Sequence, residues 1–455
     1  MLGTALNCRI STTSSFDRKH YFYADLPKGC APCGHSDREW LAPTSLTLPP
    51  FKHRYQTSQY DVPVAEDGWL EARLPEEDGG GSVRVRVSRA HMEEDSGKLV
   101  HAGSDSLSGS THSLADYNRA GTPLVEVVTA PDMRTGKEAA AYAAELQRVV
   151  RFLGVSDGNM AEGSFRCDVN ISVRPVGSSV LGTKVEVKNL NSFSAISRAV
   201  DWEIQRQVGL IEAGKATEVV QETRTWDEGA QKTRSMRTKE GLADYRYFPE
   251  PDLLPLTVTP AALQATVASM PELPAALRAR YEALGLPAKD VLLLADAADV
   301  AAYFDAVCAA GADPRGAANW IMGDLTAYAK QEKLSSLGQL KLTPAHLAEL
   351  LALVADGTIS GKIAKDLLPD LLAGGASPKA LVQQRGLVQI SDTSEIEALV
   401  DAVLAANPGQ VAEFRAGKDK LKGFFVGQIM KQSGGKANPP LVEKLLMPKL
   451  RGDAA

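Results

Sequence analysis

Glu126 is an acidic residue set inside an apolar run, Leu124 to Val128. Such a run is typical of a covered strand, where an ionised carboxylate without a partner costs several kcal/mol or shifts its pKa. A cation beside it would remove that cost, so Glu126 is a candidate metal ligand. The alternative is a strand with one wet face, or an ion pair with Arg119 or Arg134.

A second acidic feature, His91 to Asp95, concentrates three carboxylates and an imidazole just beyond the alternating segment Val83 to Val87. Mg²⁺ usually takes one or two protein carboxylates and leaves its other positions to water and phosphate. The run therefore suits magnesium. The alternative interpretation is a solvated acidic loop at the exit of a strand.

Polar residues alternate with apolar ones in two further segments, Arg166 to Val173 and Thr183 to Lys188. As strands, each would gather its polar side chains on one face. These side chains are Arg166, Asp168, Asn170 and Ser172 in the first segment and Lys184, Glu186 and Lys188 in the second. A hairpin joined near Gly177 would merge them into a charged floor for phosphate and carboxylate groups. A solvent-facing sheet with cross-strand ion pairs would show the same pattern.

Two other segments could contact nucleic acid. The loop from Asp244 to Asp252 combines Tyr245 and Arg246, which can stack an adenine or a tRNA end, although its rings could instead close a domain core. A predicted helix, Lys418 to Lys431, carries lysines off its apolar stripe, which can follow a phosphate backbone or remain solvated. The basic residues concerned are Lys418, Lys420, Lys422, Lys431 and Lys436.

The elements that must position these residues change character near residue 270. Before it, the strand-like segments alternate with two amphipathic helices, Lys137 to Phe152 and Ala195 to Ala213, which predicts an α+β layer with mainly antiparallel pairing. After it, apolar residues recur at helical spacing, and Thr343 and Asn438 precede proline as helix starts. We expect an α+β domain over 1–269, an all-α domain over 270–390 and a small helical tail over 391–455.

Composition narrows the class of protein. The chain has 455 residues, of which 44% are hydrophobic and 23% charged, as in ordinary globular proteins. No apolar run approaches the ~20 residues of a membrane span, and five cysteines give no disulfide framework. Residues 401–455 carry a net charge of +4 and the rest −10, so any contact with a polyanion is local. The GxxxxGK[ST], GxGxxG and HExxH motifs are absent, which excludes a P-loop.

Several strings together resemble one known family over nearly the whole chain. They are Ser14 to Gly29, Ser58 to Asp61, His91 to Asp95, Asp116 to Gly121, Gly154 to Asn159, Lys188 to Ser192, Asp244 to Asp252 and Val426 to Lys431. The family is the B subunit of the aspartyl/glutamyl-tRNA(Asn/Gln) amidotransferase. The resemblance implies a ligase whose N-terminal cradle uses ATP and Mg²⁺ to phosphorylate the side-chain carboxylate of mischarged glutamyl-tRNA(Gln), or of aspartyl-tRNA(Asn). An amidase A subunit would supply ammonia from glutamine, and a small C subunit would join the two.

The resemblance also implies roles for residues. Glu94 and Glu126 match magnesium-binding acids, with His91 as a further catalytic residue. The residues expected to line the nucleotide and aminoacyl pocket are Asn118, Arg119, Arg166, Asp168, Asn170, Lys184, Glu186, Lys188, Tyr245 and Arg246. The five lysines of the tail would hold tRNA.

Two departures from the family pattern stand out. The family opens with a Gly-x-Glu-x-His strand and a cysteine-rich zinc motif, and we expect both to lie upstream of Met1, so half of the metal site and the zinc site are missing. Residues 30–54 form an insert that resembles an unspliced intron or a loose surface loop, and its lone Cys30 and Cys33 pair lacks the second half of a zinc site. An intron favours a eukaryote, where the family serves mitochondria or chloroplasts; the alternative is the bacterial cytoplasm.

Other classes of function stay open at this point. A catalytically incomplete subunit could bind tRNA or assist assembly without a working metal site. A metal-dependent hydrolase unrelated to tRNA would need a nucleophile or a complete metal cluster, and the sequence displays neither.

Overall fold

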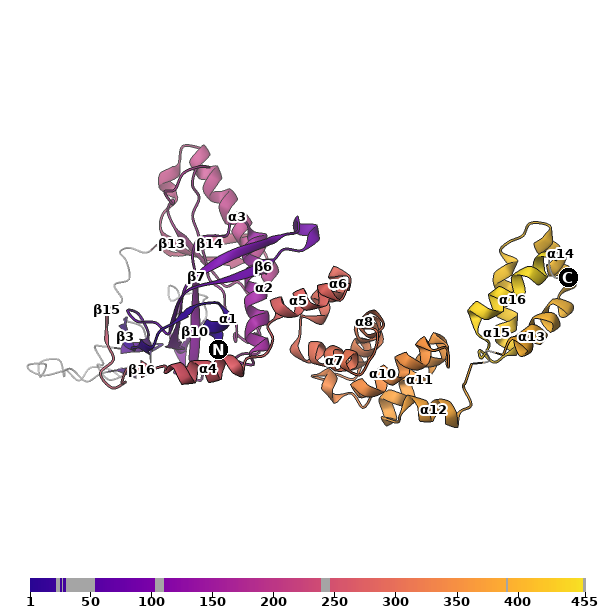
Figure 1. The fold of residues 1–455 in the computed structure, drawn as a ribbon. Helices are drawn as coiled ribbons and strands as arrows, with labels where there is room; N and C mark the ends of the chain where they lie inside the picture. Colours follow the sequence, from indigo (N-terminus) through magenta and orange to yellow (C-terminus); the bar gives the residue numbers. More distant parts are fainter. Residues whose placement is uncertain are drawn as a thin grey trace, which may run out of the picture. The chain divides into compact units, whose positions relative to one another are not determined.

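The computed structural model describes residues 1–21, 25–26, 28–29, 54–102, 110–238, 246–389 and 392–452. The predicted insert therefore lies outside the described residues except for its last position. Contacts divide the chain into two compact units, Met1–Leu273 and Pro274–Ala455. The first combines sheets with helices and the second is helical, which confirms the predicted fold class (Figure 1).

Three four-stranded sheets organise the described part of the first unit. The first has the order β1-β6-β7-β10, the second β11-β12-β13-β14 and the third β15-β3-β5-β4. Their strands are β1 Arg9–Ile10, β3 Asp17–His20, β4 Lys28–Gly29, β5 Arg54–Ser58, β6 Ala65–Arg73, β7 Ser82–Glu94, β10 Pro123–Thr129, β11 Val169–Ile171, β12 Val185–Lys188, β13 Glu222–Asp227, β14 Lys232–Thr238 and β15 Arg246–Pro249. Neighbouring strands are antiparallel except β12 and β13, which are parallel.

Smaller elements complete the first unit. Two strand pairs, β2 with β16 and β8 with β9, stand apart from the larger sheets. The remaining elements are β2 Thr13–Ser14, β8 Lys98–His101, β9 Ser113–Asp116, β16 Leu256–Thr257, α1 Leu2–Ala5, α2 Gly136–Phe152, α3 Phe193–Glu212, α4 Pro260–Ala268 and the 3₁₀ turns Glu76–Asp78 and Ala216–Glu218. The two long helices lie within two residues of their predicted bounds.

Helix α2 connects the first and second sheets (Figure 1). Its start is fixed by a capping box, in which the Thr135 hydroxyl accepts from the Glu138 amide and the Glu138 carboxylate accepts from the Thr135 amide. Leu146 and Val149 on one side of α2 pack in the core of the first sheet. Ala139 and Ala143 pack instead in a second core with α3 and the strands β11 and β12. One helix thus sets the relation between two sheets.

The second unit consists of helices whose starts follow capping residues. Thr343 caps α10 and Asn438 caps α16, each before a proline, as predicted. The helices are α5 Pro274–Ala283, α6 Ala288–Leu294, α7 Ala298–Ala309, α8 Pro314–Trp320, the π-helical turn Ile321–Leu325, α9 Thr326–Gln331, the 3₁₀ turn Leu337–Gln339, α10 Pro344–Ala355, α11 Gly361–Gly374, α12 Pro378–Gln384, α13 Thr393–Ala406, α14 Pro408–Arg415, α15 Leu421–Gln432 and α16 Pro439–Arg451. The last four share a core of their own around Phe425 and Ile429.

Helices α2 and α3 approach each other closely at Gly136. A Cβ atom there would lie 2.1 Å from the Ser197 carbonyl oxygen and 2.8 Å from the Asp201 carboxylate. We predict that Gly136→Ala lowers the free energy of unfolding by about 1–3 kcal/mol, because a helix backbone must shift to admit the methyl group. Gly209 in α3 has no atom within 4 Å of its added Cβ, so Gly209→Ala should raise stability by about 0.5–1 kcal/mol. Urea unfolding of both variants tests this, and equal stabilities would contradict it.

Candidate active site

His91, Glu93 and Glu126 converge at the end of the first sheet. In the pairing of β7 with β10, Glu126 stands directly opposite His91, and Glu93 lies two residues further along the same face of β7. The His91 Nε2 atom is 3.8 Å from the Glu126 carboxylate and 4.0 Å from that of Glu93. One ligand atom from each residue fits within a group whose members are all within 4.8 Å of one another. The three side chains form what we term the acidic cluster.

Glu94 does not belong to the acidic cluster. It lies on the other face of β7, where its carboxylate accepts from the Thr57 amide at 2.9 Å and from the Lys28 ammonium at 2.6 Å. The expectation that Glu94 and Glu126 share one ion is therefore corrected, and the acid that faces Glu126 is Glu93. The predicted strand stops too early at Val87, whereas β7 continues to Glu94 and imposes strand alternation on the acidic run.

Glu126 is also less buried than its apolar neighbours predict. Its side chain is 48% exposed, because β10 is an edge strand of the sheet. Val125 beside it is likewise exposed. The expected burial of Glu126 is wrong. Val125 and Glu126 point to opposite faces of β10 and both are exposed, so exposure is not confined to the single wet face of the alternative. The exposed Glu126 carboxylate beside the partly buried Glu93 leaves the acidic cluster open to ligands from solvent.

The acidic cluster has unequal protonation properties. Burial lowers the pKa of His91 to about 4, and the charges of Arg89 and Lys19 act in the same direction, so the imidazole is neutral at pH 7. Burial raises the pKa of Glu93; Glu126 adds to this rise, and Lys19 opposes it. A neutral imidazole with two carboxylates is a donor set that accepts a divalent cation.

The third sheet contributes a cation and a hydroxyl to the acidic cluster. The Lys19 ammonium of β3 lies 3.7 Å from the Glu93 carboxylate, and the Ser58 hydroxyl donates to the same carboxylate at 3.4 Å. The Gln56 side chain of β5 also hydrogen-bonds the Glu94 carbonyl oxygen. Neither Lys19 nor Ser58 is adjacent to the acidic run in sequence, so sequence patterns alone carry no signal for them.

Two predicted arginines meet on one buried carboxylate. Asp95 accepts from the Arg119 guanidinium at 2.7 Å, and the Arg166 guanidinium lies 3.0 Å from the same oxygen. Asp95 is buried, whereas the side chains of Arg119 and Arg166 are about half exposed. The two guanidinium groups and one carboxylate carry one net positive charge. We call Arg119 and Arg166, joined by Asp95, the arginine pair. Asp95 lies two residues after Glu93, so the arginine pair borders the acidic cluster.

The predicted charged floor forms in a shorter version. Strands β11 and β12 pair as an antiparallel hairpin, with Asn170 opposite Glu186. The Lys188 ammonium contacts Asp168 at 2.7 Å and Glu186 at 3.4 Å. Burial alone would lower the pKa of Lys188, but Asp168 and Glu186 outweigh burial and raise it. Arg166 departs from the floor toward Asp95 because β11 begins only at Val169.

The remaining predicted pocket residues are more dispersed. Lys184 is exposed just before β12, and Asn118 hydrogen-bonds Asp116 within its own turn. Arg246 begins β15, but nothing is described of its side chain, and Tyr245 lies outside the described residues. The roles of these residues stay predictions.

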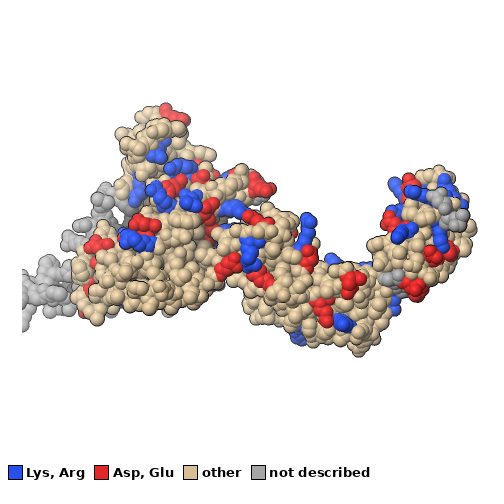
Figure 2. Space-filling view, viewed as in Figure 1, with Lys and Arg blue, Asp and Glu red and all other residues tan. Residues whose placement is uncertain are grey.

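The lysines of the tail differ in their surroundings. Lys418 pairs with Glu413 at 3.2 Å and Lys422 with Glu443, whereas no ion pair involves Lys420, Lys431 or Lys436 within the described residues. Helix α15 begins at Leu421, so Lys418 and Lys420 precede it instead of lying within it. Basic and acidic side chains are interspersed on the face of the tail that Figure 2 shows.

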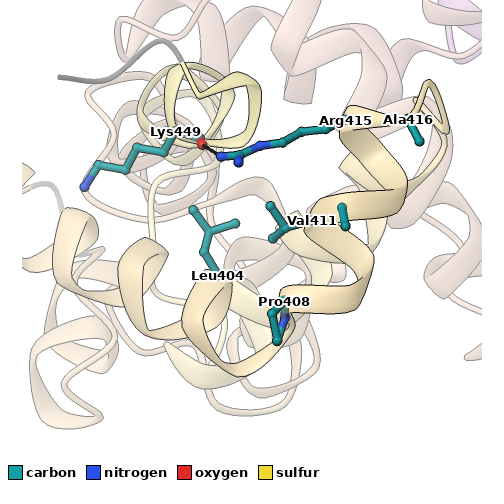
Figure 3. A pocket seen from close by; sticks show the side chains of 7 residues that line it. Leu404, Pro408, Val411, Arg415, Ala416 and Lys449 are labelled. Atoms are coloured by element: carbon teal, nitrogen blue, oxygen red, sulfur yellow. Dashed lines mark hydrogen bonds between the residues drawn. The ribbon is translucent and has the colours of Figure 1, made fainter.

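A groove in the tail gathers apolar and basic residues (Figure 3). Its lining residues are Leu404, Pro408, Val411, Ala412, Arg415, Ala416 and Lys449. The Arg415 guanidinium donates to the carbonyl oxygens of Leu450 and Lys449, which satisfies orphan carbonyls at the end of α16. None of the lining residues is acidic, so this groove has no donor set for a divalent cation.

Comparison with known proteins defines the class. Residues 1–31 and 47–264 match the family described as the GatB/GatE catalytic domain, and residues 302–450 match the GatB domain. The first match is interrupted inside the predicted insert. In the part of the chain that the structure describes, no helix is long and apolar enough to cross a membrane.

Curated relatives give the same family at high identity. The chain is 58% identical to the B subunit of the aspartyl/glutamyl-tRNA(Asn/Gln) amidotransferase of Thermosynechococcus vestitus, over 98% of this chain and 84% of the relative. It is 55% identical to the chloroplastic/mitochondrial glutamyl-tRNA(Gln) amidotransferase B subunit of Physcomitrium patens, over 99% and 75%, and to that of Oryza sativa, over 100% and 78%. The chain belongs to the family of tRNA amidotransferase B subunits, which confirms the resemblance.

The neutral state of His91 has a consequence for acid stability. Its pKa is about 4 in the folded chain and 6.5 in the reference state, so the unfolded chain binds more protons between these values. Stability from this group is full above pH 6.5 and is lost as the pH falls toward 4. At about pH 5 the loss is about 2 kcal/mol relative to about pH 7.5. We predict that His91→Gln loses less stability over this interval.

Urea unfolding at both pH values, with a chelator present, measures this difference. The same acid sensitivity in the variant and the unmodified chain would show that His91 is not held in its neutral form.

Proposed function

We propose that this chain uses ATP to activate the side-chain carboxylate of mischarged glutamyl-tRNA, as the B subunit of a tRNA-dependent amidotransferase. The observation that carries this proposal is the convergence of His91, Glu93 and Glu126 beside Lys19. Metal-binding carboxylates and nearby cations are groups that phosphoryl transfer uses, because its catalysis consists mainly of positioning and charge stabilisation. The neutral imidazole adds a further ligand for the metal.

The acidic cluster is the proposed magnesium site. His91, Glu93 and Glu126 would hold the ion, and a bound Mg²⁺ would offset the charge of the nucleotide phosphates. Two properties of the cluster fit this assignment. The imidazole is neutral and so presents a lone pair, and the raised pKa of Glu93 reflects burial and repulsion by Glu126 that a cation would relieve.

The arginine pair is the proposed anion site. Guanidinium groups bind phosphate and carboxylate through paired N–H donors, and Asp95 already holds Arg119 and Arg166 side by side. Their exposed donors can receive a phosphate of the nucleotide or the substrate carboxylate. The charged floor, with Asp168, Glu186 and Lys188, lies in the second sheet and is the proposed wall of the aminoacyl pocket.

The reaction proceeds in two steps, phosphorylation of the carboxylate and then amidation. A side-chain carboxylate oxygen of the glutamyl group attacks the terminal phosphorus of ATP; the bond from that phosphorus to the ADP oxygen breaks, and an acyl phosphate forms. Ammonia then attacks the carbonyl carbon, phosphate leaves, and a proton is lost to give the amide. A carboxylate is a poor acceptor for ammonia, and the phosphoryl group makes its oxygen a good leaving group. Lys19 and the arginine pair offset the negative charge that gathers in the first step.

The other components follow from the same assignment. An amidase A subunit is the proposed source of ammonia from glutamine, with a small C subunit joining the two, and aspartyl-tRNA(Asn) is a further proposed substrate. The moss and rice relatives are chloroplastic/mitochondrial proteins by name, which supports a place in chloroplasts or mitochondria. The cyanobacterial relative supports the bacterial alternative.

Replacing the acids of the cluster tests its chemical role. With partner subunits and glutamyl-tRNA(Gln) present, Glu93→Gln and Glu126→Gln should each lower ATP-dependent phosphate release at least about 100-fold, because a ligand to the cation is lost. Affinity for tRNA should not change. Glu71→Gln is the matched control, since Glu71 is an exposed acid on β6 that contacts Ser82 and Arg84.

Phosphate release that persists in both cluster variants would refute the metal role. An unmodified complex that binds tRNA but releases no phosphate would favour the assembly role instead.

The tail lysines are the proposed contacts to tRNA phosphates. Replacing Lys420, Lys431 and Lys436 together with Ala should weaken tRNA binding and reduce the slope of log K against log salt by about three, roughly one per phosphate contact. Lys418 and Lys422 already contact carboxylates, so their double Ala variant should change the slope less. Binding titrations over a series of salt concentrations measure both slopes. Identical slopes in all three proteins would exclude the tail from the tRNA interface.

A further inference from the structure

Tyr60 and Tyr247 form a stacked aromatic pair beside the acidic cluster. Their ring centroids are 4.2 Å apart and their planes differ by 17°. Tyr60 is 47% exposed, although aromatic rings carry a large apolar surface that proteins usually cover. The stacking therefore leaves about half of Tyr60 open to solvent.

The segments that hold the tyrosine pair also approach the acidic cluster. Tyr247 of β15 stands opposite Lys19 in the register with β3, so both side chains share one face of the third sheet. The Lys19 ammonium is the group that lies 3.7 Å from Glu93. The Arg89 guanidinium carbon also lies near this pair, 5.9 Å from the centre of the Tyr60 ring. Arg89 lies two residues before His91 on the same face of β7.

The backbone around Tyr60 is held in place. Its amide donates to the Asp17 carboxylate at 2.8 Å. The preceding residue, Gln59, is fully buried. Its side-chain nitrogen donates to the Ser14 hydroxyl, and its side-chain oxygen accepts from the Met92 backbone amide of β7. The Tyr60 ring therefore projects from an anchored segment. Binding of a ligand on this ring costs little conformational entropy, because the protein segment is already ordered.

We propose that Tyr60, backed by Tyr247 and flanked by Arg89, is the platform on which an adenine base stacks. The inference rests on the proposed function, whose substrates carry adenine twice, in ATP and in the terminal adenosine of tRNA. Aromatic stacking recognises any nucleobase face, and an adjacent guanidinium adds a cation–π contact and a phosphate donor. The adjacent acidic cluster and Lys19 would then receive the phosphate or carboxylate end of the same ligand.

Binding measurements on the complex with its partner subunits test the platform. Tyr60→Ala should weaken binding about 5- to 150-fold, the range that loss of one base–aromatic stack gives. Tyr60→Phe keeps the ring and should bind as the unmodified chain does. Tyr60→Leu keeps apolar volume without a π face, so it should match the Ala variant and separates stacking from folding. Trp69→Ala is the matched control, because it removes a ring of β6 that lies 4.1 Å from the Arg84 guanidinium carbon of β7.

Two ligands separate the sources of adenine. One arm uses a non-hydrolysable ATP analogue, and the other uses tRNA(Gln) with and without its terminal adenosine. A loss in the first arm assigns the platform to ATP, and a loss in the second that needs the terminal adenosine assigns it to tRNA. Unchanged dissociation constants in both arms for Tyr60→Ala would overturn the platform alone. An unmodified complex that binds neither ligand would overturn the platform together with the proposed function.

Discussion

The register between β7 and β10 is the constraint on which the site depends. It places Glu126 opposite His91, and strand alternation then brings Glu93, not Glu94, to the same face. A slip of one residue would exchange every side chain between the two faces and put Glu94 beside Glu126. Strand β6 stabilises this register on one side, because its long pairing with β7 buries Val85 and Val87. At the end of β7, Glu94 stabilises it further through its contacts with Thr57 and Lys28.

The same constraint determines the electrostatics. His91 is buried, Glu93 is partly buried and Glu126 is half exposed, so a neutral imidazole and a carboxylate of raised pKa meet a carboxylate in contact with water. Two like charges this close favour a cation between them. Lys19 supplies part of that charge within the chain, at 3.7 Å from Glu93. The negative charge of the two carboxylates is thus only partly offset by Lys19, and the remaining negative charge favours binding of an external cation.

Sequence patterns predicted the local elements well and the contacts between them poorly. The helical spacing of apolar residues was enough to predict the positions of α2 and α3, because each helix buries one continuous apolar stripe. It was not enough for the acidic run, because His91 to Glu94 has no apolar alternation and the end of β7 was placed at Val87. The pairing of Lys19 with Glu93, and of Arg166 with Asp95, joins residues more than 70 positions apart through packing of whole sheets. No local pattern encodes such contacts. The family resemblance paired Glu94 with Glu126, but it carried no information on the strand alternation that separates them.

Alternation of side chains along β7 places different functional groups one after another on the same face of the strand. Arg89 flanks the tyrosine pair, His91 and Glu93 join Glu126, and Asp95, just past the strand, holds the arginine pair. Alternate residues of a strand are about 6.6 Å apart, so these positions span about 20 Å. A nucleotide that meets an acyl group has the same sequence of parts: a base, a chain of phosphates and an accepting carboxylate. One rigid strand can therefore fix the spacing of all three in the proposed site. Helix α2 packs against this sheet and the next, so it holds the charged floor in a fixed position relative to β7.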